Sequence, residues 1–256
     1  MLETDILDLN PTDDIVVLSF SFEMLSTKQV GRKISAKLKR TTSELYSTRE
    51  SLNDITYGAV INAAKTLINY PIYYVDQHAT LKDIKNVVKH FHETIAKNKW
   101  LIIILDHTLL VNNEGRDERT TIAELNKFFI SAKKEGKTSI IQISQMNRDI
   151  EKPERINNPA MHYPMRSDLS SSDSVFQGSD YVIVIHRPET LHILQYGPHG
   201  LPTKDLVYLH FLKNREGEIK ILQFVNNLKY NTLDEPDKIQ TNQQNLFNNQ
   251  NESIAA

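Results

Sequence analysis

The sequence predicts an α/β protein with a mostly parallel central sheet, because two kinds of apolar pattern alternate along it. Short, uninterrupted apolar runs are followed by longer segments in which apolar residues recur every three or four positions. The short runs are typical of strands that are buried on both faces, and the periodic segments are typical of amphipathic helices. This order predicts a parallel sheet covered by helices on both faces.

The apolar runs predict five strands, at 15–22, 71–75, 101–105, 139–143 and 181–185. Helices are expected between them, at 27–39, at about 50–69, from Leu81 to Ile95 and around Ile122 to Ala132. Ser26 and Gln29 are spaced as a capping box for the first of these helices, and Thr80 is expected to cap the third. The first helix is rich in Lys and Arg, which we interpret as a solvated face.

The last third of the chain predicts a hairpin followed by a tail. Residues 206–212 and 219–225 are apolar and flank a polar turn, which predicts a hairpin at the edge of the sheet. Residues 146–170 show no regular pattern, and so long a loop is usually functional or mobile. Nine of the twelve residues from 240 to 251 are Asn or Gln. We therefore expect one folded domain over 1–231 and a disordered tail over 232–256.

The composition excludes several classes of protein. The chain has 256 residues, of which 39% are hydrophobic, so it can bury a large core. It has no cysteine, which excludes disulfides, thiol catalysis and cysteine-bearing metal sites. Its net charge of −2 argues against a uniformly basic nucleic-acid surface. No long apolar run and no signal peptide are present in the printed residues, so we expect a cytoplasmic protein without a membrane span.

Polar residues follow two predicted strands at the edge where a parallel sheet binds its ligands. Glu23 follows the first strand, and Asp106 follows the most hydrophobic one. An Asp in that position is the Walker B arrangement, and its carboxylate can hold Mg²⁺ through water. A Glu at a neighbouring strand end can polarise an attacking water. Taken singly, each carboxylate also fits an ordinary capping or solvated residue.

Five motifs in one order resemble the DnaB-like replicative helicase family. They are Phe20-Ser21-Phe22-Glu23-Met24, Leu101-Ile102-Ile103-Ile104-Leu105-Asp106, Ile143-Ser144-Gln145-Met146-Asn147-Arg148, Ser167-Asp168-Leu169 ahead of Phe176-Gln177 and Asp180, and Lys213-Asn214-Arg215-Glu216-Gly217. Their shared order over residues 15–230 argues against a chance match. The resemblance implies a RecA-like three-layer ATPase core that forms a hexameric ring around single-stranded DNA, with ATP and Mg²⁺ as cofactors.

The resemblance also implies a role for each motif residue. Glu23 would be the catalytic carboxylate and Asp106 the Mg²⁺ partner, through water. Gln145 would be the sensor that links the γ-phosphate to the DNA-facing loop. Lys213 and Arg215 would reach into the nucleotide site of a neighbouring subunit, with Arg215 as an arginine finger. Without the other motifs, these two cations would be ordinary charges on an edge strand.

The DNA-facing loop departs from the family pattern, because Ser170-Ser171-Ser172-Asp173 stands where relatives carry Arg-Glu-Ser-Gly. Hydroxyl and backbone N–H groups also bind phosphates, so the loop can still contact DNA. Arginines elsewhere in the long loop would compensate for the missing one. The residues expected at the DNA are Arg148, Arg166, Ser170, Ser171 and Asp173, with Arg155 as a further arginine of the loop.

A second departure is that the 256 residues contain no P-loop, G-x-x-x-x-G-K-[ST]. Gly136-Lys137-Thr138 is a partial match, but Ser131 stands where the first glycine belongs. The segment also joins a helix to a strand, whereas a P-loop joins a strand to a helix. Gly136 is better explained as the residue that ends a helix. Counting back from the first strand places the P-loop lysine at or just before Met1, so that residues 2–7 would end the helix that follows it.

These features predict the ATPase-domain portion of a replicative helicase, which couples ATP hydrolysis to translocation on single-stranded DNA and duplex unwinding. Lacking the P-loop, the isolated chain is expected to be inactive, and a companion chain would supply the motif. A primase or a helicase loader is a further expected partner. The alternative is a non-catalytic RecA-like module that binds DNA or caps a helicase ring, although Glu23, Asp106, Gln145 and Arg215 together argue against it. A recombinase-type filament protein would lack the Lys213-Asn214-Arg215 signature.

Overall fold

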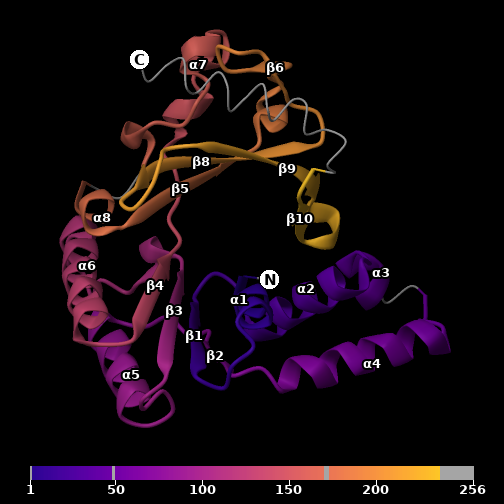
Figure 1. The fold of residues 1–256 in the computed structure, drawn as a ribbon, viewed down its shortest axis with the longest axis vertical. Coiled ribbons are helices and arrows are strands. Elements are labelled where there is room, and N and C mark those ends of the chain that lie inside the picture. The colour runs from indigo at the N-terminus through magenta and orange to yellow at the C-terminus, as the bar shows by residue number, and fades with distance from the viewer. Residues whose placement is uncertain (1, 48–49, 170–172, 237–256) are drawn as a thin grey trace. The chain divides into compact units, whose positions relative to one another are not determined.

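The computed structural model describes residues 2–47, 50–169 and 173–236, and these form two compact units. The first unit comprises the described parts of 1–147 and 166–179, together with 229–231. The second comprises 148–165 and 180–228, and continues from residue 232. Each unit has its own sheet (Figure 1).

The sheet of the first unit has four parallel strands in the order β2-β1-β3-β4. The strands are β1 (Ile15–Ser21), β2 (Ile72–Val75), β3 (Trp100–Asp106) and β4 (Thr138–Gln142). Each lies within one or two residues of its predicted range, so the prediction of a parallel sheet is confirmed. Uninterrupted apolar runs identified these strands because the sheet is buried on both faces.

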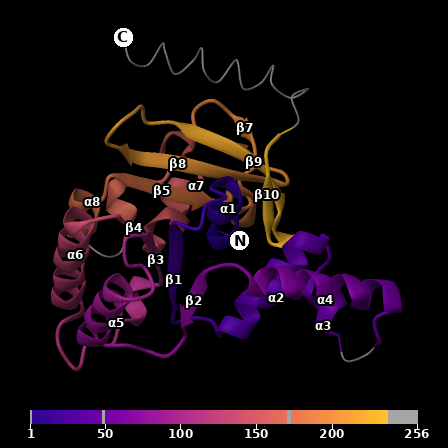
Figure 2. The same cartoon turned by 60° about the horizontal axis from the view of Figure 1, so that its bottom comes forward.

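Helices cover both faces of this sheet. Those of the first unit are α1 (Leu2–Leu9), α2 (Ser26–Leu38), α3 (Thr42–Tyr46), α4 (Asp54–Ile68), α5 (Leu81–Glu93), α6 (Glu118–Glu135) and α8 (Asp173–Gly178), with short 3₁₀ turns at Thr108–Leu110 and Arg166–Asp168. The apolar stripes of α5 and α6 pack on one face of β1 and β3, and α1 packs on the other. Figure 2 shows α5 beside α6, and α2 beside α4, as Figure 1 does.

The alternation of side chains along the central strands divides the core between the two faces. Leu18 and Ile103 are fully buried against α5 and α6, whereas Val17 and Ile102 are buried with Leu7 of α1. Successive side chains of a strand point to opposite faces, so a strand that is apolar at every position stabilises both layers.

The predicted capping box of the first helix is wrong. Ser26 is the first residue of α2, and the N-cap Leu25 makes no side-chain capping bond. The Ser26 N–H instead donates to Asp76 Oδ2 over 3.0 Å, and Gln29 Nε2 donates to Ser21 Oγ over 3.1 Å. A carboxylate fifty residues away in the chain therefore satisfies the helix N-terminus, which local spacing does not reveal.

Two other helix boundaries are confirmed. Thr80 caps α5 through a capping box in which its side chain accepts from Asp83 N and its own N–H donates to the Asp83 carboxylate. α6 ends at Glu135, immediately before Gly136.

The second unit contains an antiparallel sheet in the order β10-β9-β8-β5. Its strands are β5 (Tyr181–His186), β8 (Leu206–Asn214), β9 (Ile221–Asn227) and β10 (Thr232–Asp234), and a small ribbon pairs β6 (Gln195–Tyr196) with β7 (Leu201–Pro202). The predicted hairpin is confirmed as β8–β9, but its expected place at the edge of the parallel sheet is wrong. It pairs instead with β5, in a separate sheet. An apolar run predicts a strand without indicating its partner.

The expected tail begins with a strand, because β10 pairs antiparallel with β9. The Asn- and Gln-rich part of the tail falls in 237–256, outside the described residues. No helix in the described ranges is long and apolar enough to cross a membrane.

Residues 146–170 were expected to lack regular structure, and this is wrong in detail. Short helical turns are present at Arg148–Glu151, Pro153–Ile156 (α7), Pro159–Met161 and Arg166–Asp168. Arg155 is only 5% exposed, and its guanidinium donates to Met161 O over 3.0 Å and to Tyr163 O over 2.8 Å. It therefore closes a turn within its own unit and is not a surface arginine for DNA.

A buried aromatic and histidine cluster lies between β5, β6 and β8. The Tyr196 hydroxyl lies 2.7 Å from His186 Nδ1 and 2.8 Å from His210 Nε2. His162 stacks on the Tyr196 ring at a centroid distance of 6.2 Å. Burial, reinforced by His186, lowers the pKa of His210 to about 3, so this ring is neutral near pH 7.

Candidate functional site

The register of the parallel sheet brings three predicted site residues to one edge. Ser21 pairs with Asp106, and Leu105 pairs with Gln142, so β1, β3 and β4 end at the same level. Glu23, Asp106 and Gln145 lie at or just beyond these ends. This is the edge at which an open parallel sheet binds ligands.

The two carboxylates of this edge act on each other. Asp106 is half-buried, and its pKa is raised above the ordinary value by burial and by the negative charge of Glu23. His107 and Arg32 oppose this shift. Like charges that share a site disfavour ionisation, and a divalent cation bound there would offset them.

The donor chemistry fits Mg²⁺ completed by ligands from outside the protein. Within 2–47, 50–169 and 173–236, no group of three or more His, Asp or Glu side chains is placed to hold a metal ion. Mg²⁺ is usually held by one or two carboxylates, with water and phosphate oxygens supplying the other ligands. Asp106, under the charge of Glu23, matches that requirement.

His107 is a site residue that the sequence analysis missed. Its side chain is 7% exposed, and its Nε2 lies 3.8 Å from Glu23 Oε2 and 3.3 Å from Gln145 Nε2. The ring thus contacts both the expected catalytic carboxylate and the expected sensor. The available signal was its position directly after Asp106 at a strand end, because burial of the ring is not visible in the sequence.

Hydrogen bonds fix the backbone beneath this site. Thr108 donates to Ile143 O through its N–H, over 3.1 Å, and through its Oγ1, over 2.9 Å. Gln142 Nε2 donates to Thr108 Oγ1 over 3.0 Å. The ends of β3 and β4 are therefore joined directly after His107, which holds the ring in place.

A buried ion pair joins α1 to α2 in the same unit. Lys33 Nζ lies 3.1 Å from Glu3 Oε2, with the two side chains 3% and 8% exposed. Ser19 of β1 also donates to Glu3, over 3.3 Å. Burial opposes both charges, yet the attraction between them lowers the pKa of Glu3 and raises the pKa of Lys33. Lys33 is thus an exception to the solvated face expected for this helix.

Lys213 and Arg215 belong to the second unit. Lys213 lies on β8 opposite Val182. Arg215 follows β8, and its Nη1 donates to Asp180 Oδ1 over 2.6 Å. Its side chain is 54% exposed. Because these cations and Glu23 lie in different units, their meeting at one nucleotide stays a prediction.

The residues expected at DNA are distributed between the two units. Arg148 is exposed on a 3₁₀ turn of the second unit. Arg166 of the first unit is also exposed, and its guanidinium lies 4.5 Å from the Phe176 ring centroid. Asp173 begins α8. Ser170 and Ser171 lie outside the described residues, so their expected contacts with DNA stay predictions.

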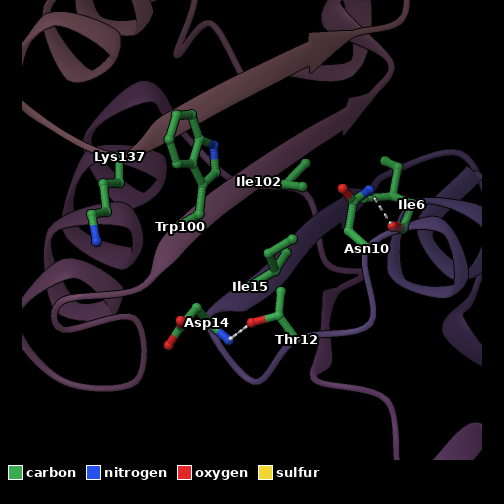
Figure 3. Close-up of a pocket in the computed structure, with 8 residues that line it drawn as sticks. All are labelled: Ile6, Asn10, Thr12, Asp14, Ile15, Trp100, Ile102 and Lys137. Carbon is green, nitrogen blue, oxygen red and sulfur yellow. Dashed lines mark hydrogen bonds between the residues drawn. The ribbon is translucent and has the colours of Figure 1, made fainter.

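A pocket of about 420 Å³ lies at the opposite edge of the parallel sheet (Figure 3). Its lining includes Ile15 and Trp100, the first residues of β1 and β3, and Lys137, which precedes β4. Figure 3 shows the apolar side chains between the bonded pairs Asn10–Ile6 and Asp14–Thr12. The pocket is therefore separate from the strand ends that carry Glu23 and Asp106.

Comparison with curated proteins finds replicative helicases. The replicative DNA helicase DnaB of Buchnera aphidicola subsp. Baizongia pistaciae is 29% identical over 178 residues, which are 69% of this chain and 37% of the relative. The replicative DNA helicase DnaB of Mycoplasma pneumoniae is 29% identical over 216 residues, which are 82% of this chain and 43% of the relative. The chain thus spans about two fifths of the length of these relatives.

Solved structures and a family profile agree with these matches. A solved helicase-type ATPase domain matches with a TM-score of 0.74 and 18% identity, over 88% of this chain and 76% of that one. A DnaB-like replicative helicase, described with its interactions with primase, gives a TM-score of 0.73 and 18% identity, over 88% and 51%. The fold is therefore RecA-like, with an additional antiparallel sheet. Since the profile of the DnaB-like helicase C-terminal domain matches residues 3–235, the chain belongs to that family.

Proposed function

We propose that this chain is the ATPase-domain part of a replicative DNA helicase, which couples ATP hydrolysis to movement on single-stranded DNA and to duplex unwinding. The observation that carries the proposal is the convergence of Glu23, Asp106 and Gln145 at the carboxyl edge of the parallel sheet in a member of this family. A module that never meets a nucleotide has no physical need for that set.

Each residue of the edge has a distinct part in the proposal. Asp106 holds Mg²⁺ through water, and the ion, when bound, offsets charge on the phosphate oxygens. Glu23 is 58% exposed beyond its strand, where it orients and polarises the attacking water. Gln145 senses the γ-phosphate and passes its presence to the loop that follows. Phosphoryl transfer needs mainly such positioning and charge stabilisation.

Lys213 and Arg215 act in the proposal on the nucleotide of a neighbouring subunit. Arg215 is more than half exposed, which suits a side chain that reaches out of its own subunit. Its bond to Asp180 engages one Nη1, and a guanidinium has five N–H donors in all. An arginine finger raises the rate of hydrolysis about 10³- to 10⁵-fold.

The 256 residues by themselves are proposed to be inactive, because they contain no P-loop to cradle the phosphates. Activity then requires a strand–helix segment with that motif from a companion chain or a joined polypeptide. The full assembly is proposed to be a hexameric ring on single-stranded DNA. Arg148, Arg166 and the segment from Ser170 to Asp173 contact the DNA phosphates, and a primase or loader is a further partner.

The test uses a chimera in which a strand–helix segment bearing G-x-x-x-x-G-K-[ST] precedes residue 2. We expect DNA-stimulated ATPase from the chimera and none from the chain alone. Glu23→Gln should abolish turnover while nucleotide binding remains, and Glu118→Gln, on the exposed start of α6, is the matched control. A chimera that binds DNA but turns over no ATP would favour the non-catalytic module, and turnover by the chain alone would contradict the requirement for a P-loop.

A further inference from the structure

His107 occupies a position between two residues whose motions have to be coordinated. A single ring nitrogen, Nε2, lies 3.8 Å from a carboxylate oxygen of Glu23 and 3.3 Å from the amide nitrogen of Gln145. The other ring nitrogen, Nδ1, is buried and has no hydrogen-bond partner among the described residues. The polar contacts that the structure shows for this ring therefore all involve Nε2.

One ring nitrogen cannot serve both neighbours fully at the same time. Nε2 of a neutral imidazole either carries a proton and donates, or lacks one and accepts. A carboxylate can only accept from it, whereas the amide of Gln145 offers both a donor and an acceptor. Any change that strengthens the contact with Gln145 therefore weakens the contact with Glu23, and the reverse.

The ring is also the fixed member of the three. His107 is 7% exposed, and the bonds of Thr108 to Ile143 O hold the backbone next to it. Glu23 is 58% exposed, and Gln145 is an exposed residue outside the regular elements. Movement at the site is thus expected in Glu23 and Gln145, with the imidazole as the point between them.

We propose that His107 is a positioning residue that couples the orientation of Glu23 to the state of Gln145. The inference rests on the proposed function and adds a component to it. When Gln145 shifts toward a γ-phosphate, its claim on Nε2 is released and the ring holds Glu23 in the orientation for water attack. When Gln145 returns, Glu23 is released. No proton is gained or lost in this exchange.

The coupling is measured first in the chain itself, without nucleotide. The ¹H–¹⁵N signals of the Gln145 side-chain amide are recorded with and without Glu23→Gln, in three backgrounds: native, His107→Leu and His107→Gln. His107→Leu removes the ring nitrogen, whereas His107→Gln retains a polar group at similar reach. We expect Glu23→Gln to shift the amide signals in the native and Gln backgrounds and to leave them unmoved in the Leu background. An equal shift in the Leu background would overturn the proposal.

The second measurement is kinetic and uses the P-loop chimera. His107→Leu should lower kcat about 10- to 100-fold and remove its stimulation by single-stranded DNA, with the KM for ATP unchanged. His107→Gln should restore most of the rate, which loss of folding alone does not predict. If turnover depends on Glu23 but His107→Leu leaves kcat and DNA stimulation intact, the coupling is wrong and the helicase proposal survives. If Glu23→Gln leaves turnover intact, the proposed function fails, and the amide signals still decide the coupling.

Discussion

Arg215 Nη1 donates a 2.6 Å hydrogen bond to Asp180 Oδ1, and the Arg215 N–H donates to Asp180 O over 3.0 Å. The residue expected to reach a neighbouring subunit is therefore held at the end of β8 by an acidic residue that precedes β5 in the same chain. Because the side chain is 54% exposed, the ion pair itself contributes little to folding, about 0–1 kcal/mol. Its value is in aiming the guanidinium.

Arg215→Ala should abolish hydrolysis in the assembled chimera, with a loss of about 10³- to 10⁵-fold, because the charge of the finger is removed. Urea unfolding of the monomer should change by less than about 1 kcal/mol. Arg116→Ala is the matched control, since Arg116 is also an exposed arginine, 59% accessible, that pairs with carboxylates. Normal turnover by Arg215→Ala would rule out its action on a neighbouring nucleotide.

Lys33→Met should destabilise the first unit by about 3–5 kcal/mol, because it leaves the buried Glu3 carboxylate without its partner. The double variant Glu3→Leu with Lys33→Met should recover most of this loss, since it replaces the pair by apolar groups. Urea denaturation measures both. Lys89→Met, in an exposed pair with Glu93, is the control and should cost no more than about 0.5 kcal/mol. Equal effects of Lys33→Met and Lys89→Met would contradict the buried pair.

The free energy of unfolding should fall as the pH is lowered from about 6.5 toward 3, partly because of His210. The pKa of this residue is lowered to about 3 in the fold, from 6.5. Between these values the unfolded chain binds a proton that the folded chain does not, so stability rises with pH. His210→Gln should reduce the slope by up to about 1.4 kcal/mol per pH unit. Unfolding curves at several pH values test this, with exposed His90→Gln as the control; parallel slopes for wild type and His210→Gln would contradict it.

Glu23→Gln should stabilise the nucleotide-free chain slightly at pH 7. Burial and the Glu23 charge raise the pKa of Asp106, so stability is lost as the pH rises through the folded pKa of Asp106. Removing the Glu23 charge removes part of that loss, by at most about 1 kcal/mol at this exposed position. Thermal unfolding of Glu23→Gln beside Glu118→Gln measures it. A lower melting temperature for Glu23→Gln alone would show that the two carboxylates do not oppose each other.

The sequence identified what depends on local pattern. The runs at β1 and β3 predict strands because they are apolar at every position, and Thr80 predicts a helix start because its partner Asp83 lies three residues away. Glu23 and Asp106 were identified as site residues because they follow parallel strands. Whatever joins neighbours in sequence, or follows from a parallel register, was accessible.

What the sequence did not reveal depends on distant partners and on burial. The cap of α2 comes from Asp76, and β5 pairs with β8 across some twenty intervening residues rather than joining the parallel sheet. His107 and Arg155 are both types of residue usually found at the surface, and only the folded chain buries them. Their partners are set by tertiary packing, which no spacing rule contains.

Localising bound nucleotide tests the central claim most directly. The chimera is loaded with Mn²⁺ and a non-hydrolysable ATP analogue, and paramagnetic broadening of amide signals is mapped. The account predicts that signals of Glu23, Asp106 and Gln145 broaden, while those of Ile15 and Trp100 at the opposite edge of the sheet stay sharp. Broadening at Ile15 and Trp100 with sharp signals from Glu23, Asp106 and Gln145 would contradict it.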